Sequence, residues 1–249
     1  MTSSRRVRLY GALGFVVFLI LWQAVGALRL AGPSIPSVSD VFAIYRQPWR
    51  LALLGRAAMS TLLSAATGLI LGALLGSLTA LIAHLIRPMR LGLDRLAVMI
   101  NAVPAVALGP ILIVTVGRDW TPSTLSSIPV FFLTFVTVSS GLRSVNPRLN
   151  DVFAALGASR VSRLVHLELP AAIPAFLAGL RVSVSAAIVG AIVGEWFGSS
   201  TGLGIIILNT MLNFQIPLMW AAMVFAVAAS LIAYGLVGSL ERRARSHFS

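Results

Sequence analysis

The feature that most constrains this sequence is a series of long stretches in which almost no side chain is charged. A helix that crosses the hydrocarbon core of a bilayer needs about 20 consecutive apolar residues, because its backbone polar groups find no partner there outside the helix. We expect six such helices, over residues 9–28, 57–86, 96–117, 120–142, about 172–194 and about 218–240. The sequence therefore predicts an all-α, polytopic membrane protein.

The composition supports this interpretation. Of the 249 residues 58% are hydrophobic and only 10% are charged, whereas about 25% of residues are charged in soluble domains. We treat residues 1–249 as a single membrane domain. Between the last two spans we expect a connection and no further span, because the segment is interrupted by Thr201, Gly202, Gly204, Asn209, Asn213, Gln215 and Pro217.

Missing residue types exclude several kinds of chemistry. All 19 basic residues are arginine, and without lysine the chain has neither a Walker A phosphate loop nor a Schiff-base lysine. It has no cysteine, and His84, His166 and His247 are far apart in the sequence, which argues against thiol chemistry and the usual zinc sites. Solute binding, solute passage and mechanical coupling remain, so we do not expect an enzyme.

The positions of the arginines predict the orientation in the membrane, because short loops rich in arginine stay in the cytoplasm. With the N-terminus inside, the inner segments hold thirteen arginines, which are Arg5, Arg6, Arg8, Arg87, Arg90, Arg95, Arg143, Arg148, Arg160, Arg163, Arg242, Arg243 and Arg245. The outer segments hold Arg29, Arg46, Arg50, Arg56 and Arg118. Both termini should therefore be cytoplasmic. Because the arginines separate apolar runs and form no basic face, we expect no nucleic-acid partner.

The N-terminal arginines followed by an apolar run are also typical of a signal peptide. This run is longer than the 7 to 15 residues of a signal-peptide core, and no clear cleavage site ends it. We therefore expect a helix that is retained.

The longest inner segment, residues 143–170, predicts two short helices in a hairpin. Asn150 or Asp151 is expected to cap the first helix, and Gly157 to form the turn between the two. An amphipathic hairpin of this kind is typical either of a docking surface for a cytoplasmic partner or of a helix that lies on the membrane surface. The pattern alone leaves both open.

The same segment carries a spaced series of residues. Acidic Asp151 is followed six positions later by Gly157. Nine residues then separate Gly157 from Leu167, and Leu169 and Pro170 end the series. This spacing resembles the EAA signature, a cytoplasmic motif in the permease subunits of binding-protein-dependent ABC importers. The hairpin is thereby favoured as a docking surface.

The resemblance has two departures and extends along most of the chain. Asp151 stands where the signature usually has glutamate, and Val152-Phe153 where it has two alanines. Over about residues 34–245 the sequence is similar to the nitrate, sulfonate and taurine branch of these permeases, with agreement in the segments 101–117, 170–181 and 194–204.

The resemblance implies a type I ABC importer transmembrane-domain fold with a cytoplasmic coupling helix. The chain would lie in the cell membrane and hold no cofactor of its own, while a cytoplasmic ATPase dimer binds ATP and magnesium. A second permease subunit, expected to be another copy of this chain, and an extracytoplasmic solute-binding protein would complete the complex. The residues implied in ATPase coupling, in a hairpin of about residues 147–170, are Asp151, Ala154, Ala155, Gly157, Ala158, Leu167, Leu169 and Pro170.

Small residues and prolines indicate how the spans pack. Gly68, Gly72 and Gly76 are spaced four apart, which permits close helix packing, either within one subunit or against a second one. Pro104 and Pro110 favour a kink in the third span.

Polar residues within the spans are candidates for the solute path. Arg181 is expected to reach the membrane surface or to contact Glu168, and Glu195 to line the path or to contact the binding protein. The candidate path residues are Asn101, Pro104, Ser183, Ser185 and Glu195.

The substrate class implied by the resemblance is a small polar solute. A small organic sulfonate or a similar anion, such as taurine or nitrate, is the first hypothesis, and a thiamine-precursor pyrimidine or an aromatic carboxylate is the second. A different class of protein, an ion-driven secondary transporter, would need intramembrane ion ligands and usually an internal repeat. The sequence shows no repeat, and Glu195 is the only membrane carboxylate.

Overall fold

A computed structural model describes residues 3–248, with the side chains of residues 6–7, 9–239 and 241–242. Every regular element in these ranges is helical. Five helices are long and apolar enough to cross a membrane, or six when one bent pair counts as a single span. The five are α1 (Ser3–Ala27), α3 (Pro48–Leu85), α6 (Thr121–Arg143), α9 (Leu169–Glu195) and α11 (Ile216–Phe248). The predicted all-α polytopic fold is thus confirmed.

The third predicted span, residues 96–117, corresponds to the bent pair, and the kink that Pro104 favours is a complete break between two helices. The structure has α4 (Arg87–Ala102) and α5 (Ala105–Thr115), which meet at 95°. Val103, which precedes Pro104, is extended with ψ 126°, because the ring of a proline disfavours the helical conformation of the residue before it. The helix therefore ends here and a new one starts in another direction. Pro110 lies inside α5.

The centre of the bundle consists of α3, α6 and α9, which pack along much of their length. Gly68, Gly72 and Gly76 line the face of α3 that meets α6. A Cβ atom at Gly72 would lie 2.5 Å from the carbonyl oxygen of Ser127 and 2.7 Å from the Cβ of Val130. The glycines thus allow two backbones to approach more closely than any side chain would permit.

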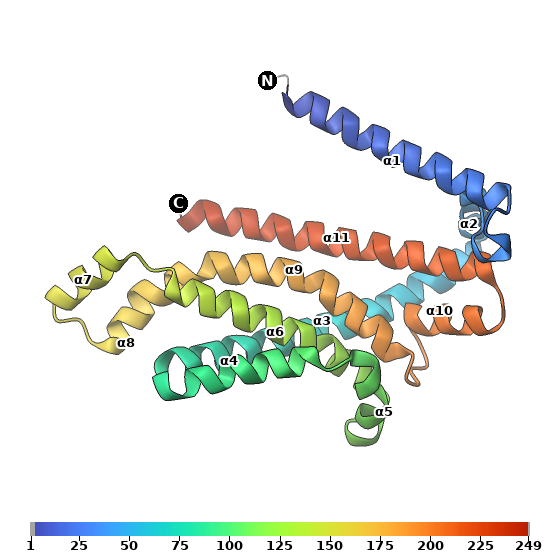
Figure 1. The fold of residues 1–249 in the computed structure, drawn as a ribbon. Coiled ribbons are helices and arrows are strands. Elements are labelled where there is room, and N and C mark those ends of the chain that lie inside the picture. The colour runs from blue at the N-terminus through green and yellow to red at the C-terminus, as the bar shows by residue number, and fades with distance from the viewer. Residues whose placement is uncertain (1–2, 249) are drawn as a thin grey trace.

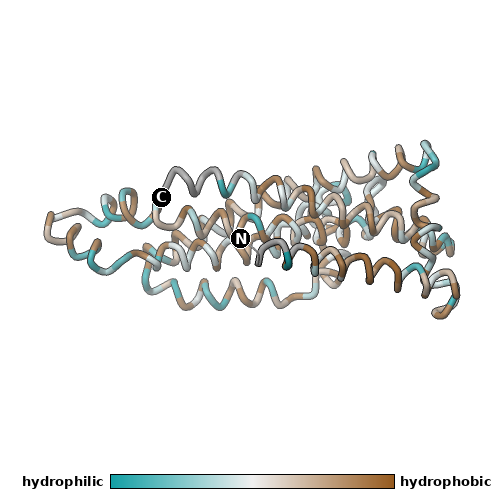
Figure 2. Tube along the Cα trace, turned by 90° about the horizontal axis from the view of Figure 1, so that it is seen from above, coloured by the Kyte–Doolittle hydropathy of each residue, from teal (hydrophilic) through white to brown (hydrophobic). Residues whose placement is uncertain are grey.

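The two ends of the bundle differ in what they carry. One end, here called the hairpin end, extends into α7 (Pro147–Ala155) and α8 (Arg160–Arg163), at the left of Figure 1. The opposite end, here called the α10 end, carries α2 (Val38–Tyr45), a 3₁₀ turn (Gly32–Ser34) and α10 (Leu203–Leu212). In Figure 2 the apolar residues lie mainly along the spans and hydrophilic ones gather towards both ends.

Helix α10 is an addition to the elements expected from the sequence. It starts where Glu195, at the end of α9, accepts a hydrogen bond of 2.7 Å from the backbone nitrogen of Gly204. The backbone nitrogen of Leu203 donates to Thr61 Oγ1 at 2.9 Å. These two side chains satisfy amides in the first turn that have no partner within the helix.

Helix α1 stands apart from the bundle along most of its length (Figure 1). Only 6% of the residues in the most apolar part of its segment Leu9–Ala27 are buried. Its contacts lie at the α10 end. There Trp22 Nε1 donates to the carbonyl oxygen of Pro36 at 3.0 Å, and its ring lies 5.4 Å from that of Trp220. This aromatic contact fixes one end of α1 beside α11.

Candidate functional site

The hairpin begins earlier than expected. Asn146, not Asn150 or Asp151, caps α7: its side chain accepts a hydrogen bond of 3.0 Å from the nitrogen of Arg148, and Pro147 occupies the first helical position. A proline suits that position because its missing N–H would have no partner there. The predicted cap was therefore wrong by four or five residues.

The turn between α7 and α8 is built by Gly157 and Ser159. Gly157 has a φ of +69°, a conformation that costs residues with a Cβ roughly 1–2 kcal/mol. Ser159 then caps α8 by accepting a hydrogen bond of 3.1 Å from the nitrogen of Ser162. Sequence and structure agree that the chain reverses at this glycine.

The outer surface of the hairpin is apolar and uncovered. Leu156 is 79% exposed and Val161 is 68% exposed, which is unusual for side chains with no partner to bury them. No residue of α7 is buried among those that the structure describes. Of the residues implied in coupling, the exposed ones are Asp151, Ala154, Ala155, Gly157 and Leu169, and the half-buried ones are Ala158, Leu167 and Pro170.

The base of the hairpin is held to the bundle through Glu168. The chain continues from α8 through a π-helical turn (Leu164–Glu168) directly into α9. Such a turn bonds residues five apart, and it brings Arg163 Nε within 3.3 Å of Glu168 Oε1. Glu168 Oε2 lies 2.8 Å from His84 Nε2, at the end of α3. This pair could not be predicted from the sequence, because 84 residues separate the partners.

A second feature is a cavity at the break between α4 and α5. Its volume is about 560 Å³. Three of the five candidate path residues, Asn101, Pro104 and Ser185, line it. The other described lining residues are apolar or glycine, and none carries a charge: Ala102, Val103, Ala105, Leu125, Ile128, Pro129, Ala186, Val189, Gly190 and Val193.

The other two candidate path residues lie elsewhere. Ser183 is fully buried and donates to the carbonyl oxygen of Gly179 at 2.9 Å. Glu195 is only 1% exposed and closes the turn into α10. Both side chains form a hydrogen bond within this chain, although Glu195 Oε1 has no hydrogen-bond partner among the described residues, and in this structure neither side chain lines the cavity or reaches the surface.

Of the two alternatives expected for Arg181, the contact with Glu168 is not formed. It lies 3.3 Å from Glu241 of α11, and its guanidinium carbon is 4.4 Å from the centre of the Tyr234 ring. Glu168 is instead paired with His84 and Arg163. Arg181 thus joins α9 to α11, a structural role.

Comparison with known proteins places these features in a family. The model of the "binding-protein-dependent transport system inner membrane component" family matches residues 68–246. A probable ABC transporter permease of Haemophilus influenzae is 33% identical over 91% of this chain and 93% of its own length. The formylaminopyrimidine transport permease ThiX of Halalkalibacterium halodurans is 30% identical over 73% of each chain.

A more distant relative agrees with this assignment, and a solved structure has a similar fold. The putative aliphatic sulfonates transport permease SsuC of Bacillus subtilis is 27% identical over 91% of this chain and 83% of its own. The fold is similar to a chain of the inward-facing MetNI methionine ABC transporter, with a TM-score of 0.67, 16% identity, and coverage of 79% of this chain and 98% of that one.

The matched family is the membrane component of the transporter, and ATP is bound and hydrolysed by a separate subunit. This chain belongs to the inner membrane components of binding-protein-dependent transport systems and is a multi-pass permease subunit of an ABC importer.

Proposed function

We propose that this chain pairs with a second copy of itself, that the cavity at the α4–α5 break is part of the solute path, and that the hairpin couples this path to the ATPase. One observation carries the proposal: residues Arg160–Glu195 form one continuous helical run. One end of this run belongs to the hairpin, and Ser185 on the same run lines the cavity. Movement of the hairpin is therefore transmitted to the cavity as a rigid-body motion.

Docking of the ATPase on the hairpin has a simple physical basis. Leu156 and Val161 offer an apolar surface that nothing in the described chain covers. The contact of Glu168 with His84 joins the base of the hairpin to α3 and opposes free pivoting there. A closing ATPase dimer would thus pull on α9 itself.

The lining of the cavity favours an uncharged solute. An anion in a cavity that offers only neutral groups loses its hydration without gaining a cation. Asn101 and Ser185 offer hydrogen bonds that are strong enough to admit a polar solute and too weak to trap it. A pyrimidine of the kind named for the ThiX relative fits this lining better than the sulfonate expected first.

A sulfonate remains the second candidate, supported by the likeness to the SsuC permease. The two are distinguished by uptake into liposomes that contain the purified importer and its binding protein. Uptake of labelled formylaminopyrimidine, with no uptake of an aliphatic sulfonate, is the expected result. The reverse pattern would replace the pyrimidine with the sulfonate.

Asn101→Leu should lower uptake about tenfold, because it keeps the size of the side chain and removes hydrogen bonds worth roughly 1–1.5 kcal/mol. Asn101 is exposed to the cavity, so the fold should be unaffected. The control is Thr67→Leu, at a half-buried position of α3 that does not line the cavity. Equal uptake by both variants would remove Asn101 from the path.

We propose that the hairpin end is cytoplasmic, as are both termini, because thirteen arginines fall on that side and five on the other. Reporter fusions after Arg90, within residues 117–124 and at Ser249 should report inside, outside and inside. A reversed pattern at any of the three positions contradicts this orientation.

A further inference from the structure

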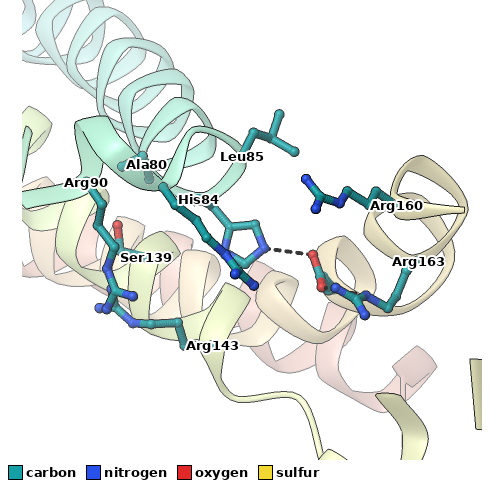
Figure 3. Close-up of a pocket in the computed structure, with 11 residues that line it drawn as sticks. Ala80, His84, Leu85, Arg90, Ser139, Arg143, Arg160 and Arg163 are labelled. Atoms are coloured by element: carbon teal, nitrogen blue, oxygen red, sulfur yellow. Dashed lines mark hydrogen bonds and ion pairs between the residues drawn. The ribbon is translucent and has the colours of Figure 1, made fainter. Parts of the chain in front are cut away.

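At the hairpin end, arginines from three parts of the fold surround a second cavity (Figure 3). Its volume is about 220 Å³. Arg87 and Arg90 come from α4, Arg143 from the end of α6, and Arg160 and Arg163 from α8. The proposed coupling and the solute path leave four of these five arginines without a role.

The cavity has an excess of positive charge. Its lining holds five arginines and one carboxylate, so four positive charges remain when His84 is neutral. That carboxylate, Glu168, is already engaged by His84 at 2.8 Å and by Arg163 at 3.3 Å. Among the described residues, Arg90 has only the distant Asp94 at 3.9 Å, outside the cavity. Converging like charges destabilise this arrangement unless an anion lies between them.

A neutral donor in the wall also lacks a partner. Ser139 is 6% exposed, and no described group forms a hydrogen bond with its Oγ. It comes from α6 and lines the cavity between the side chains of Arg90 and Arg143 (Figure 3). A buried hydroxyl without a partner costs free energy, and an oxyanion in the cavity is an acceptor that would satisfy it.

We propose that this cavity binds a phosphate group, carried either by an anionic phospholipid or by a free phosphate. Guanidinium groups bind phosphate oxygens through charge-assisted pairs of hydrogen bonds. The volume admits a group of several heavy atoms, since one water takes up about 30 Å³. A bound phosphate would join α4, α6 and α8 at the base of the hairpin.

The surroundings of the cavity favour the phospholipid. Leu85 lines the cavity and is 50% exposed. Ile86 and Met89, which follow within four residues, are each 46% exposed. Apolar side chains beside a basic pocket suit a headgroup whose acyl chains continue along the protein. With the proposed orientation, this lipid would come from the cytoplasmic leaflet. The reporter fusions test that orientation independently.

The test measures the melting temperature of the full-length chain in nanodiscs at constant ionic strength. The discs contain phosphatidylcholine alone, phosphatidylcholine with inorganic phosphate in the buffer, or equal parts of phosphatidylcholine and phosphatidylglycerol. A rise with phosphatidylglycerol only identifies the lipid, and a rise with inorganic phosphate identifies the free anion. Either rise supports the site if the cavity arginines are required for it, and no rise in either arm overturns the proposal.

In the variant Arg87→Gln/Arg160→Gln, the amount of phosphatidylglycerol or phosphate that gives half of the rise in melting temperature should increase at least roughly tenfold. This is the change in affinity expected for the loss of two charge-assisted contacts. Both side chains are exposed, so folding should be retained. Arg143→Gln gives an independent second test, and Arg95→Gln, an exposed arginine of α4 outside the cavity, is the matched control. If the cavity variants respond as Arg95→Gln does, the arginine cavity is not the site.

Discussion

Replacing Gly157 with leucine should abolish transport while the chain still inserts into the membrane. The φ of +69° at this position is one that leucine rarely adopts. The turn between α7 and α8 would change, and Leu156 and Val161 would no longer face one partner together. Nothing lies within 4 Å of the place where a Cβ would stand, so the effect would come from the backbone conformation and not from a clash. Uptake and copurification with the ATPase measure the outcome.

Gly157→Asn is the matched control, because asparagine also adds a side chain but tolerates positive φ far better. It should retain most of the transport. If Gly157→Leu transports normally, or if the two variants lose activity equally, the turn conformation is not what coupling requires.

Gly72→Leu should prevent α3 from packing on α6 and so leave little folded protein. A Cβ at this position would lie 2.5 Å from a backbone oxygen and 2.7 Å from Val130, and backbone atoms cannot move aside as the end of a flexible side chain can. Overpacking in a dense core typically costs roughly 1–3 kcal/mol and occasionally more. The yield of monodisperse protein and its melting temperature report the loss.

Gly55→Leu is the control for this variant, since it lies on the same helix and its Cβ position meets no atom within 4 Å. It should fold like the parent protein. Normal yield and stability of Gly72→Leu would show that the close contact between α3 and α6 is not required.

The spans could be predicted because hydrophobic length is a local property of the sequence. The runs at residues 120–142 and 172–194 differ from α6 and α9 by a few residues at their ends. The reversal at Gly157 could also be predicted, because only glycine adopts its conformation at little cost.

The features that the sequence analysis missed depend on distant partners. Pro104 predicts an interrupted helix, but the sequence contains neither the angle of 95° nor the packing of the Phe197 ring beside Gly109 of α5. Glu195 is a candidate path residue in the sequence, and its hydrogen bond with Gly204 at the start of α10 could not be predicted there.

The central claim is that this chain couples ATP hydrolysis by a partner to solute passage. The most direct test is solute uptake by liposomes that contain the tagged chain with its copurified ATPase and binding protein, measured with and without internal ATP. We predict uptake only with ATP and binding protein, and its loss in Gly157→Leu. Uptake driven by an ion gradient in the absence of ATP would contradict the claim and identify a secondary transporter.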